Sequence, residues 1–235
     1  SRFVNVTKTW SNTAEGVVFT LRLPRIIGAV LVGSALSLSG AAYQGVFKNP
    51  LVAPDLLGVS SGACVGASVA ILLHLNSFGV QAMAFVAGIL AVGLTLFIPR
   101  LIKNTNMTML VLSGIIVKGI MDSVMGIIKY VADPETELQS ITYWQLGSLT
   151  KVLPKDLFTV GPVIVAASVI IFLLRWRINI LSLGDREAKT LGVSVTVVRN
   201  FIIICATLLT ASAVCISGTI GWIGLVIPHF ARMLT

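Results

Sequence analysis

The sequence predicts an all-helical membrane protein, because it is rich in long uncharged apolar runs and poor in charge. Of its 235 residues, 56% are hydrophobic and only 11% are charged. A soluble domain carries about 25% charged residues, so this chain has too few charged side chains to cover a water-exposed surface. The apolar runs do not alternate with polar residues as the strands of a membrane barrel do. Helices are the other way to satisfy the backbone in lipid, and we predict an all-α, polytopic transmembrane bundle.

Six apolar runs are long enough to be predicted as full spans, since a helix needs roughly 20 apolar residues to cross the hydrocarbon core. They are Ile26–Phe47, Leu56–Leu75, Phe78–Ile98, Met107–Ile128, Leu157–Leu174 and Asn200–Ser217. A seventh run, Gly218–Ala231, is shorter and contains Pro228, so we expect a short helix or a partial span there. Residues 1–235 are predicted to form a single transmembrane domain.

Small residues recur every four positions in the second predicted span, at Gly58, Gly62, Gly66 and Ala70. This spacing places them along one face of a helix, and such stripes let helix backbones approach closely. We therefore expect this face to pack directly against another helix of the bundle.

The distribution of basic residues predicts how the bundle is oriented. The net charge is +8, and most of the internal Lys and Arg residues lie in three loops, at residues 48–55, 100–106 and 175–199. Loops rich in Lys and Arg stay on the cytoplasmic side, so these loops are predicted to be cytoplasmic and residues 129–156 to be external. Basic residues in short loops anchor spans in the lipid bilayer, and we expect no binding to nucleic acid.

Lys118 and Asp122 are the most unusual residues within a predicted span, because a charge in the middle of a bilayer is costly. Their i,i+4 spacing places them on one helix face, in a stripe that Gly114 and Gly126 extend. Either the two charges form a self-neutralising structural pair, or the stripe faces a translocation path or a subunit interface. For Gln44, in the first predicted span, the choice is between an interhelical hydrogen bond and lining a wet path.

The sequence contains no recognisable catalytic or metal-binding motif. It has no GxxxxGK[ST] phosphate loop, and its two histidines, His74 and His229, are isolated. Cys64, Cys205 and Cys215 lie in apolar runs without CxxC spacing, which is typical of buried packing residues. We therefore predict that the chain is not an enzyme and binds no metal or cofactor of its own.

Seven short motifs follow one another along nearly the whole chain. They are Leu21–Arg25, Gly33–Gly45, Lys48–Leu51, Leu57–Ala63, Tyr143–Ser148, Leu183–Val193 and Gly218–His229. Together they resemble the FecCD-type permeases, the membrane subunits of ATP-binding-cassette importers for ferric siderophores, haem and cobalamin. Complete members of that family have ten spans, so the resemblance implies that this chain lacks the first and the last of them.

The resemblance implies two docking sites for partner proteins. A cytoplasmic loop would contact the cassette ATPase subunits, although the residues alone also fit an ordinary solvated loop. The candidate residues are Leu183, Gly184, Asp185, Arg186, Glu187, Ala188, Lys189, Leu191 and Gly192. Arg22 and Arg25 would dock a substrate-binding protein on the external side, because guanidinium groups bind carboxylates well; the alternative is an interfacial anchor. Docking would explain why these arginines lie on the side where the charge rule disfavours them.

The function implied by the resemblance is that of an importer permease. Together with a second permease subunit, identical or related, the chain would form the path for a metal chelate, with ferric siderophore as the first candidate. ATP would be bound and hydrolysed on a separate ATPase subunit, and the complex would lie in the cytoplasmic (inner) membrane of a bacterium or archaeon. The alternative is an ion-coupled secondary transporter that uses Lys118 and Asp122 as a relay.

Overall fold

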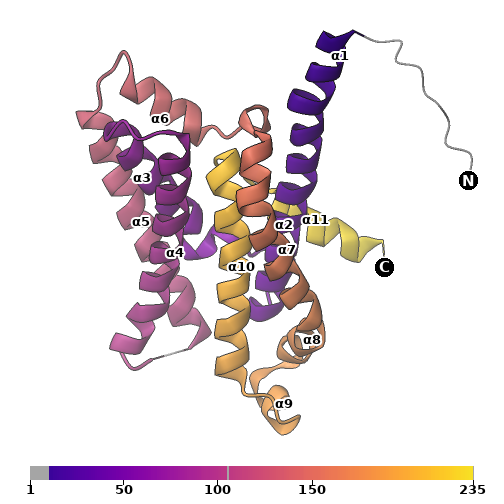
Figure 1. Cartoon of the computed structure of the whole chain (residues 1–235). Helices are drawn as coiled ribbons and strands as arrows, with labels where there is room; N and C mark the ends of the chain where they lie inside the picture. The colour runs from indigo at the N-terminus through magenta and orange to yellow at the C-terminus, as the bar shows by residue number, and fades with distance from the viewer. Residues whose placement is uncertain (1–10, 105, 235) are drawn as a thin grey trace, which may run out of the picture.

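The computed structural model describes residues 11–104 and 106–234, and every regular element in these two ranges is helical. Figure 1 shows long helices lying side by side, with shorter helices at the ends of the bundle. The long helices are α2 (Leu23–Phe47), α4 (Ser77–Leu101), α5 (Met107–Val131), α7 (Pro154–Leu173) and α10 (Val195–Ser217). The short helices are α1 (Asn12–Gly16), α3 (Val59–Leu72), α6 (Glu137–Gln145), α8 (Arg175–Leu183), α9 (Asp185–Thr190) and α11 (Ile223–Met233). The prediction of an all-helical bundle is confirmed.

Three single turns complete the described elements. A π-helical turn, η1 (Val17–Arg22), joins α1 to α2, so that residues 12–47 form one continuous helical segment. Two 3-10 turns, η2 (Pro54–Leu57) and η3 (Leu149–Lys151), precede α3 and α7. Both lie in connections between helices, η2 between α2 and α3 and η3 between α6 and α7. The η2 turn takes part in the candidate site described below.

Five helical segments of the described chain, rather than the six predicted, are long and apolar enough to cross a membrane. The difference lies at residues 56–75, where α3 has only 14 residues. At 1.5 Å per residue its length is about 21 Å, short of the ~30 Å hydrocarbon core. Gly58, in the left-handed region at φ +83°, delays its start, and His74, at φ +51°, lies just beyond its end. At the C-terminal end, α11 is the short helix expected, with Pro228 inside it.

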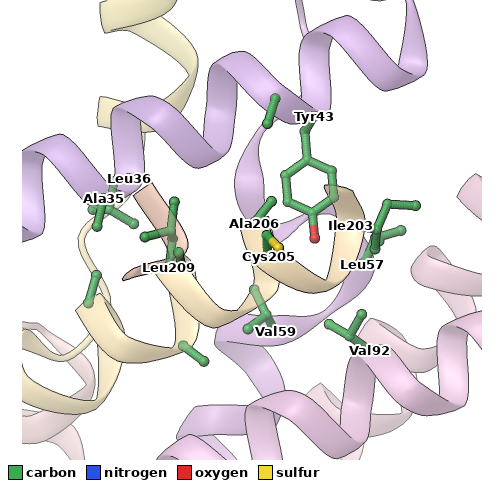
Figure 2. Packing of buried hydrophobic residues seen from close by; sticks show 14 of the residues in the cluster. Ala35, Leu36, Tyr43, Leu57, Val59, Val92, Ile203, Cys205, Ala206 and Leu209 are labelled. Carbon is green, nitrogen blue, oxygen red and sulfur yellow. The ribbon is translucent and has the colours of Figure 1, made fainter. Parts of the chain in front are cut away.

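Helix α10 lies at the centre of the bundle. In its most apolar stretch 78% of residues are buried, against 28% to 44% for the other four candidate spans. Figure 2 shows Leu36 and Tyr43 of α2 close to Ile203 and Leu209 of α10. Apolar contact of this kind fills the space between helices, but in lipid it does not by itself drive their association.

Hydrogen bonds between α2 and α10 supply the specificity that apolar contact lacks. The Ser39 hydroxyl donates to the Ala206 carbonyl oxygen at 2.9 Å and lies 2.7 Å from the hydroxyl of Thr210. The hydroxyls of Tyr43 and Thr207 are 3.0 Å apart. All of these groups are buried, where such bonds between helices fix the axial register of one helix on another.

The stripe of small residues on α3 packs against α4, as its spacing predicted. A methyl group added to Gly66 would meet the Met83 carbonyl oxygen and lie 2.6 Å from the Cβ of Ala87. A methyl group on Gly62 would lie 2.8 Å from the Ala87 carbonyl oxygen. Only hydrogen fits at these positions, so the two helix backbones are nearly in contact.

We predict that Gly66→Ala destabilises the protein by about 1–3 kcal/mol, the usual cost of overpacking. The added methyl group must push α3 away from a rigid backbone carbonyl. Gly93→Ala is the matched control, because a methyl group there meets nothing within 4 Å. Thermal unfolding of the purified protein in detergent measures both variants, and equal midpoints would contradict the prediction.

Candidate functional site

Two connecting segments that contain no α-helix enter the bundle, the first with the 3-10 turn η2 inside it. The first, residues 48–58, joins α2 to α3, and the second, residues 218–222, joins α10 to α11. The first passes the middle of α5, because a methyl group on Gly58 would lie 3.5 Å from the backbone nitrogen of Lys118. Non-helical backbone at this depth is tolerated where it is buried in protein or lines a wet cavity. These segments therefore mark the place where a polar path can exist.

The first segment packs on α11 at Gly224, the second residue of that helix. A methyl group on Gly224 would lie 2.7 Å from the Leu36 carbonyl oxygen of α2 and 2.7 Å from Cδ of Pro54. A methyl group on Gly40 of α2 would collide with the Gly224 carbonyl group. Glycine is needed at both positions because two backbones and a proline ring occupy the space.

Gln44 of α2 links the first segment to α11. It is 4% exposed, and its amide nitrogen donates to the carbonyl oxygens of Val52 and Leu225, at 3.3 Å each. Its amide oxygen accepts a hydrogen bond from the Arg232 guanidinium group. Of the two roles open from the sequence, this geometry is that of an interhelical hydrogen bond.

A polar hollow of about 210 Å³ lies where these segments face α5. Its wall combines charged, hydroxyl and amide side chains from several elements with the indole of Trp222. The polar lining residues are Asp55, Ser60, Ser61, Lys118, Asp122, Gln145, Thr210 and Thr219. Such a concentration of polar groups within an apolar bundle is the expected signature of a transport path.

Lys118 and Asp122 both line this hollow, but Lys118 has a different partner from the one that the sequence suggested. Its ammonium nitrogen lies 3.8 Å from a carboxylate oxygen of Asp55. In the described part of the chain, no ion pair joins Lys118 to Asp122. The side chains of Lys118 and Asp55 are 47% and 45% exposed. The self-neutralising pair is therefore not formed, and the reading in which this face lines a polar space is favoured.

The rest of the predicted stripe divides between two environments. Gly114 packs on the backbone of the 48–58 segment, since a methyl group there would lie 3.2 Å from the Cα of Leu57. Gly126 has open space around it. The stripe therefore runs from a packed contact with η2, past the charged hollow, to an exposed surface.

The loop at residues 175–199, which the charge rule predicts to be cytoplasmic, contains a second cluster of charges. Asp185 begins α9 and accepts hydrogen bonds from the Arg199 guanidinium at 2.8 and 2.9 Å and from the Lys48 ammonium at 2.9 Å. Hydrogen bonds from Arg199, the largest cause, and from Lys48, a smaller one, lower the pKa of the Asp185 carboxyl below its usual value. Ala188, one turn on, is buried. This face of α9 is turned toward the bundle.

The remaining candidate residues of the loop are turned outward or form its turns. The exposed ones are Leu183, Arg186, Glu187, Lys189, Leu191 and Gly192. Gly184 and Gly192 lie at φ +148° and +77°, conformations that glycine adopts without steric cost. The loop thus exposes two basic side chains, of Arg186 and Lys189, and two large apolar ones, of Leu183 and Leu191. The carboxylate of Asp185, the first residue of α9, is already paired with Lys48 and Arg199.

Arg22 and Arg25 lie at the opposite end of α2 from Lys48. Arg22 is exposed at the end of η1, and Arg25 is half-buried beside the buried Pro24. Figure 1 shows α1 and η1 projecting past the ends of α7 and α10. Arg22 is therefore accessible to a partner on that side of the bundle.

The comparison with known proteins gives the family. The profile of the FecCD transport family matches residues 1–235. The chain belongs to the FecCD transport family. With five apolar candidate spans, it is an integral membrane protein.

Relatives in this family are named for different cargoes. The chain is 39% identical over 221 residues to the molybdate import system permease protein MolB of Haemophilus influenzae, covering 94% of this chain and 65% of MolB. It is 37% identical over 221 residues to the hemin transport system permease protein HmuU of Yersinia pestis, covering 91% of this chain and 65% of HmuU. The chain thus spans less than two thirds of the length of these relatives.

A solved structure confirms the arrangement of the helices. It is described as an inward-facing conformation of a metal-chelate type ABC transporter, and it is 36% identical to this chain. The two superpose with a TM-score of 0.90, covering 100% of this chain and 75% of that one. The family and the fold therefore agree.

Several residues of both clusters were not expected from the sequence. Asp55 and Lys48 lie in a predicted loop, and Arg199 lies just before a predicted span. Their partners come from distant parts of the chain, so spacing along one helix cannot reveal them. A usable signal was the acidic Asp55 directly after Pro54 and before a stripe of small residues, because a charge there must find a polar environment.

We predict that cysteines placed at Lys118 and Asp122 react with a water-soluble maleimide, because both positions line the polar hollow. The background for this test is a variant with the native cysteines replaced, since Cys64 lines the same hollow. A cysteine at Val117, which is 2% exposed, is the unreactive control. Labelling confined to the Ile115 and Gly119 side of α5 would contradict this assignment.

Proposed function

We propose that this protein is the membrane-spanning permease subunit of an ATP-binding-cassette importer, and that it forms the path for a metal chelate. The observation that carries the proposal is the polar hollow between α5 and the two connecting segments, 48–58 and 218–222, in an otherwise apolar bundle. Membership of the FecCD transport family and the likeness to a metal-chelate type transporter support the same reading. Ferric siderophore is the first candidate cargo, although relatives are named for molybdate and haem.

A second permease subunit, identical or related, completes the path in this proposal. The hollow, at about 210 Å³, is below the roughly 300–1,000 Å³ of a typical small-molecule pocket. Helix α5 is the least buried of the five candidate spans, at 28%. Ile115, Ile116 and Ile120 on its surface are 45% to 56% exposed. A partner subunit packed along this face would enclose Lys118 and Asp122 in a wider path between the two subunits.

Two further partners act from the two sides of the membrane. A substrate-binding protein docks on the exposed Arg22 and the half-buried Arg25, whose guanidinium groups can bind its carboxylates in bidentate fashion. Cassette ATPase subunits dock on the outward face of the α8–α9 loop, and ATP is bound and hydrolysed there, not on this chain. The cycle takes place in the cytoplasmic (inner) membrane of a bacterium or archaeon.

We predict that vesicles containing the full-length permease transport a ferric chelate only when the ATPase subunits, ATP and the loaded binding protein are all present. The competing function is an ion-coupled secondary transporter, which the accessible charges of Lys118 and Asp122 would suit. That function requires only an ion gradient. Uptake driven by a proton or sodium gradient without ATP would therefore contradict the proposal.

We predict that Arg22→Glu weakens binding-protein docking by roughly tenfold or more, because losing one partner of an interfacial charge pair costs about 2–5 kcal/mol. Arg100→Glu is the matched control, since Arg100 is exposed at the other end of the bundle, in the last turn of α4. Binding of the substrate-binding protein to the permease in lipid nanodiscs measures both. Unchanged affinity for Arg22→Glu in a folded protein would refute the docking role.

A further inference from the structure

Asp185 lies between basic side chains from two different long helices. Lys48 ends α2 in the left-handed conformation, at φ +53°, and Arg199 lies in the second turn of α10. Both donate hydrogen bonds to the same carboxylate, at 2.8 to 2.9 Å. One acidic side chain of the cytoplasmic loop therefore touches α2 and α10 at once.

Each of these helices leads to the central hollow. Lys48 is the first residue of segment 48–58, in which Asp55 of η2 pairs with Lys118. Helix α10 runs without interruption from Val195 to Ser217 and continues into segment 218–222, which lines the same hollow. A displacement at Asp185 thus has two physical routes to the residues around Lys118, one through segment 48–58 and one along α10 to segment 218–222.

The link to Arg199 is stronger than an ordinary surface ion pair. Arg199 is only 9% exposed, and its Nε has no hydrogen-bond partner among the described residues. Asp185 is therefore the group that neutralises this guanidinium. Charge-assisted hydrogen bonds are roughly twice as strong as neutral ones, and a buried charge that loses its partner is strongly destabilised. The contact will hold α9 to α10 when the loop is pushed or pulled.

The other basic groups of α9 are free for a different task. Arg186 and Lys189 are exposed, and neither forms an ion pair within the described ranges. A helix of this length has room for one inward face and one outward face. The inward face carries Asp185 and the buried Ala188, so the outward face is the one that a soluble partner can reach.

We propose that Asp185 is a positioning residue that transmits movement of the ATPase-facing loop, through Lys48 and Arg199, to the two segments that line the central hollow. This inference rests on the proposed importer function and assigns Asp185 a role within the permease, through its contacts with α2 and α10, instead of a role at the ATPase interface. Its removal uncouples transport from ATP hydrolysis without preventing assembly.

The test uses the full-length transporter, with its ATPase subunits and binding protein, reconstituted in vesicles with a ferric chelate. For Asp185→Asn we expect the ATPase subunits to remain bound and to hydrolyse ATP, while chelate transported per ATP falls at least about fivefold, the lower end of usual coupling between sites. Asp185→Glu, which keeps the carboxylate, restores a substantial part of the coupling. A purely structural role would not separate hydrolysis from transport.

Lys48→Gln is the second variant and keeps the test informative if Asp185→Asn fails to fold. Lys48 is 35% exposed, and its replacement leaves the buried Arg199 paired with Asp185. It cuts only the route to segment 48–58, so it also lowers transport per ATP. Unchanged stoichiometry in these variants would overturn the inference, as would loss of bound ATPase from Asp185→Asn.

Arg186→Glu with Lys189→Glu is the matched control on the outward face, and here we expect the ATPase subunits to be lost. This control separates the inference from the proposed function on which it rests. Wild-type transport without ATP would refute the importer itself, whereas an ATP-dependent wild type with a fully coupled Asp185→Asn variant refutes only the role of Asp185.

Discussion

The close approach of Gly40 and Gly224 fixes the centre of this protein. Where these two helix backbones touch, there is no room for side chains, and Pro54 of segment 48–58 packs on the same contact. Gln44, one turn along α2, then donates to the carbonyl oxygens of Val52 in that segment and of Leu225 in α11. Unsatisfied backbone groups in hydrocarbon are costly. The connecting segments can therefore line a polar hollow only because the neighbouring helices shield their backbone from lipid. Asp55, Lys118 and Asp122 line this hollow, with the side chains of Asp55 and Lys118 about half exposed.

The helices were predictable because membrane spans are determined mainly by composition. Uncharged runs such as Met107–Ile128 have few structural alternatives in lipid, and the helix found there is Met107–Val131. The shortening of α3 was not predictable from hydropathy, since residues 56–58 are as apolar as the helix that follows. Its late start depends on Gly58 adopting the left-handed conformation and on the contact of the preceding turn with α5. Both are tertiary effects.

The candidate site was predictable only in part, and for a related reason. The i,i+4 spacing of Lys118 and Asp122 pointed to the helix face that lines the hollow, but not to Asp55 as the partner of Lys118, because it considers only neighbours on one helix. Asp55 comes from a segment that folds back into the bundle. In the loop at residues 175–199, the sequence indicated a charged surface for a partner, yet Asp185 is paired with Lys48 and Arg199 of the bundle. Which side of a short helix faces the bundle is decided by packing, not by its composition.

The left-handed conformation of Lys48 has a consequence for how this protein balances stability against activity. A non-glycine residue at positive φ is strained by about 1–3 kcal/mol, and a glycine at the end of α2 would relieve this strain. Glycine would also remove the ammonium group that reaches Asp185. Selection for heat resistance alone would therefore favour a residue that lacks the charge. Variants chosen for higher stability should therefore be checked here first for lost activity.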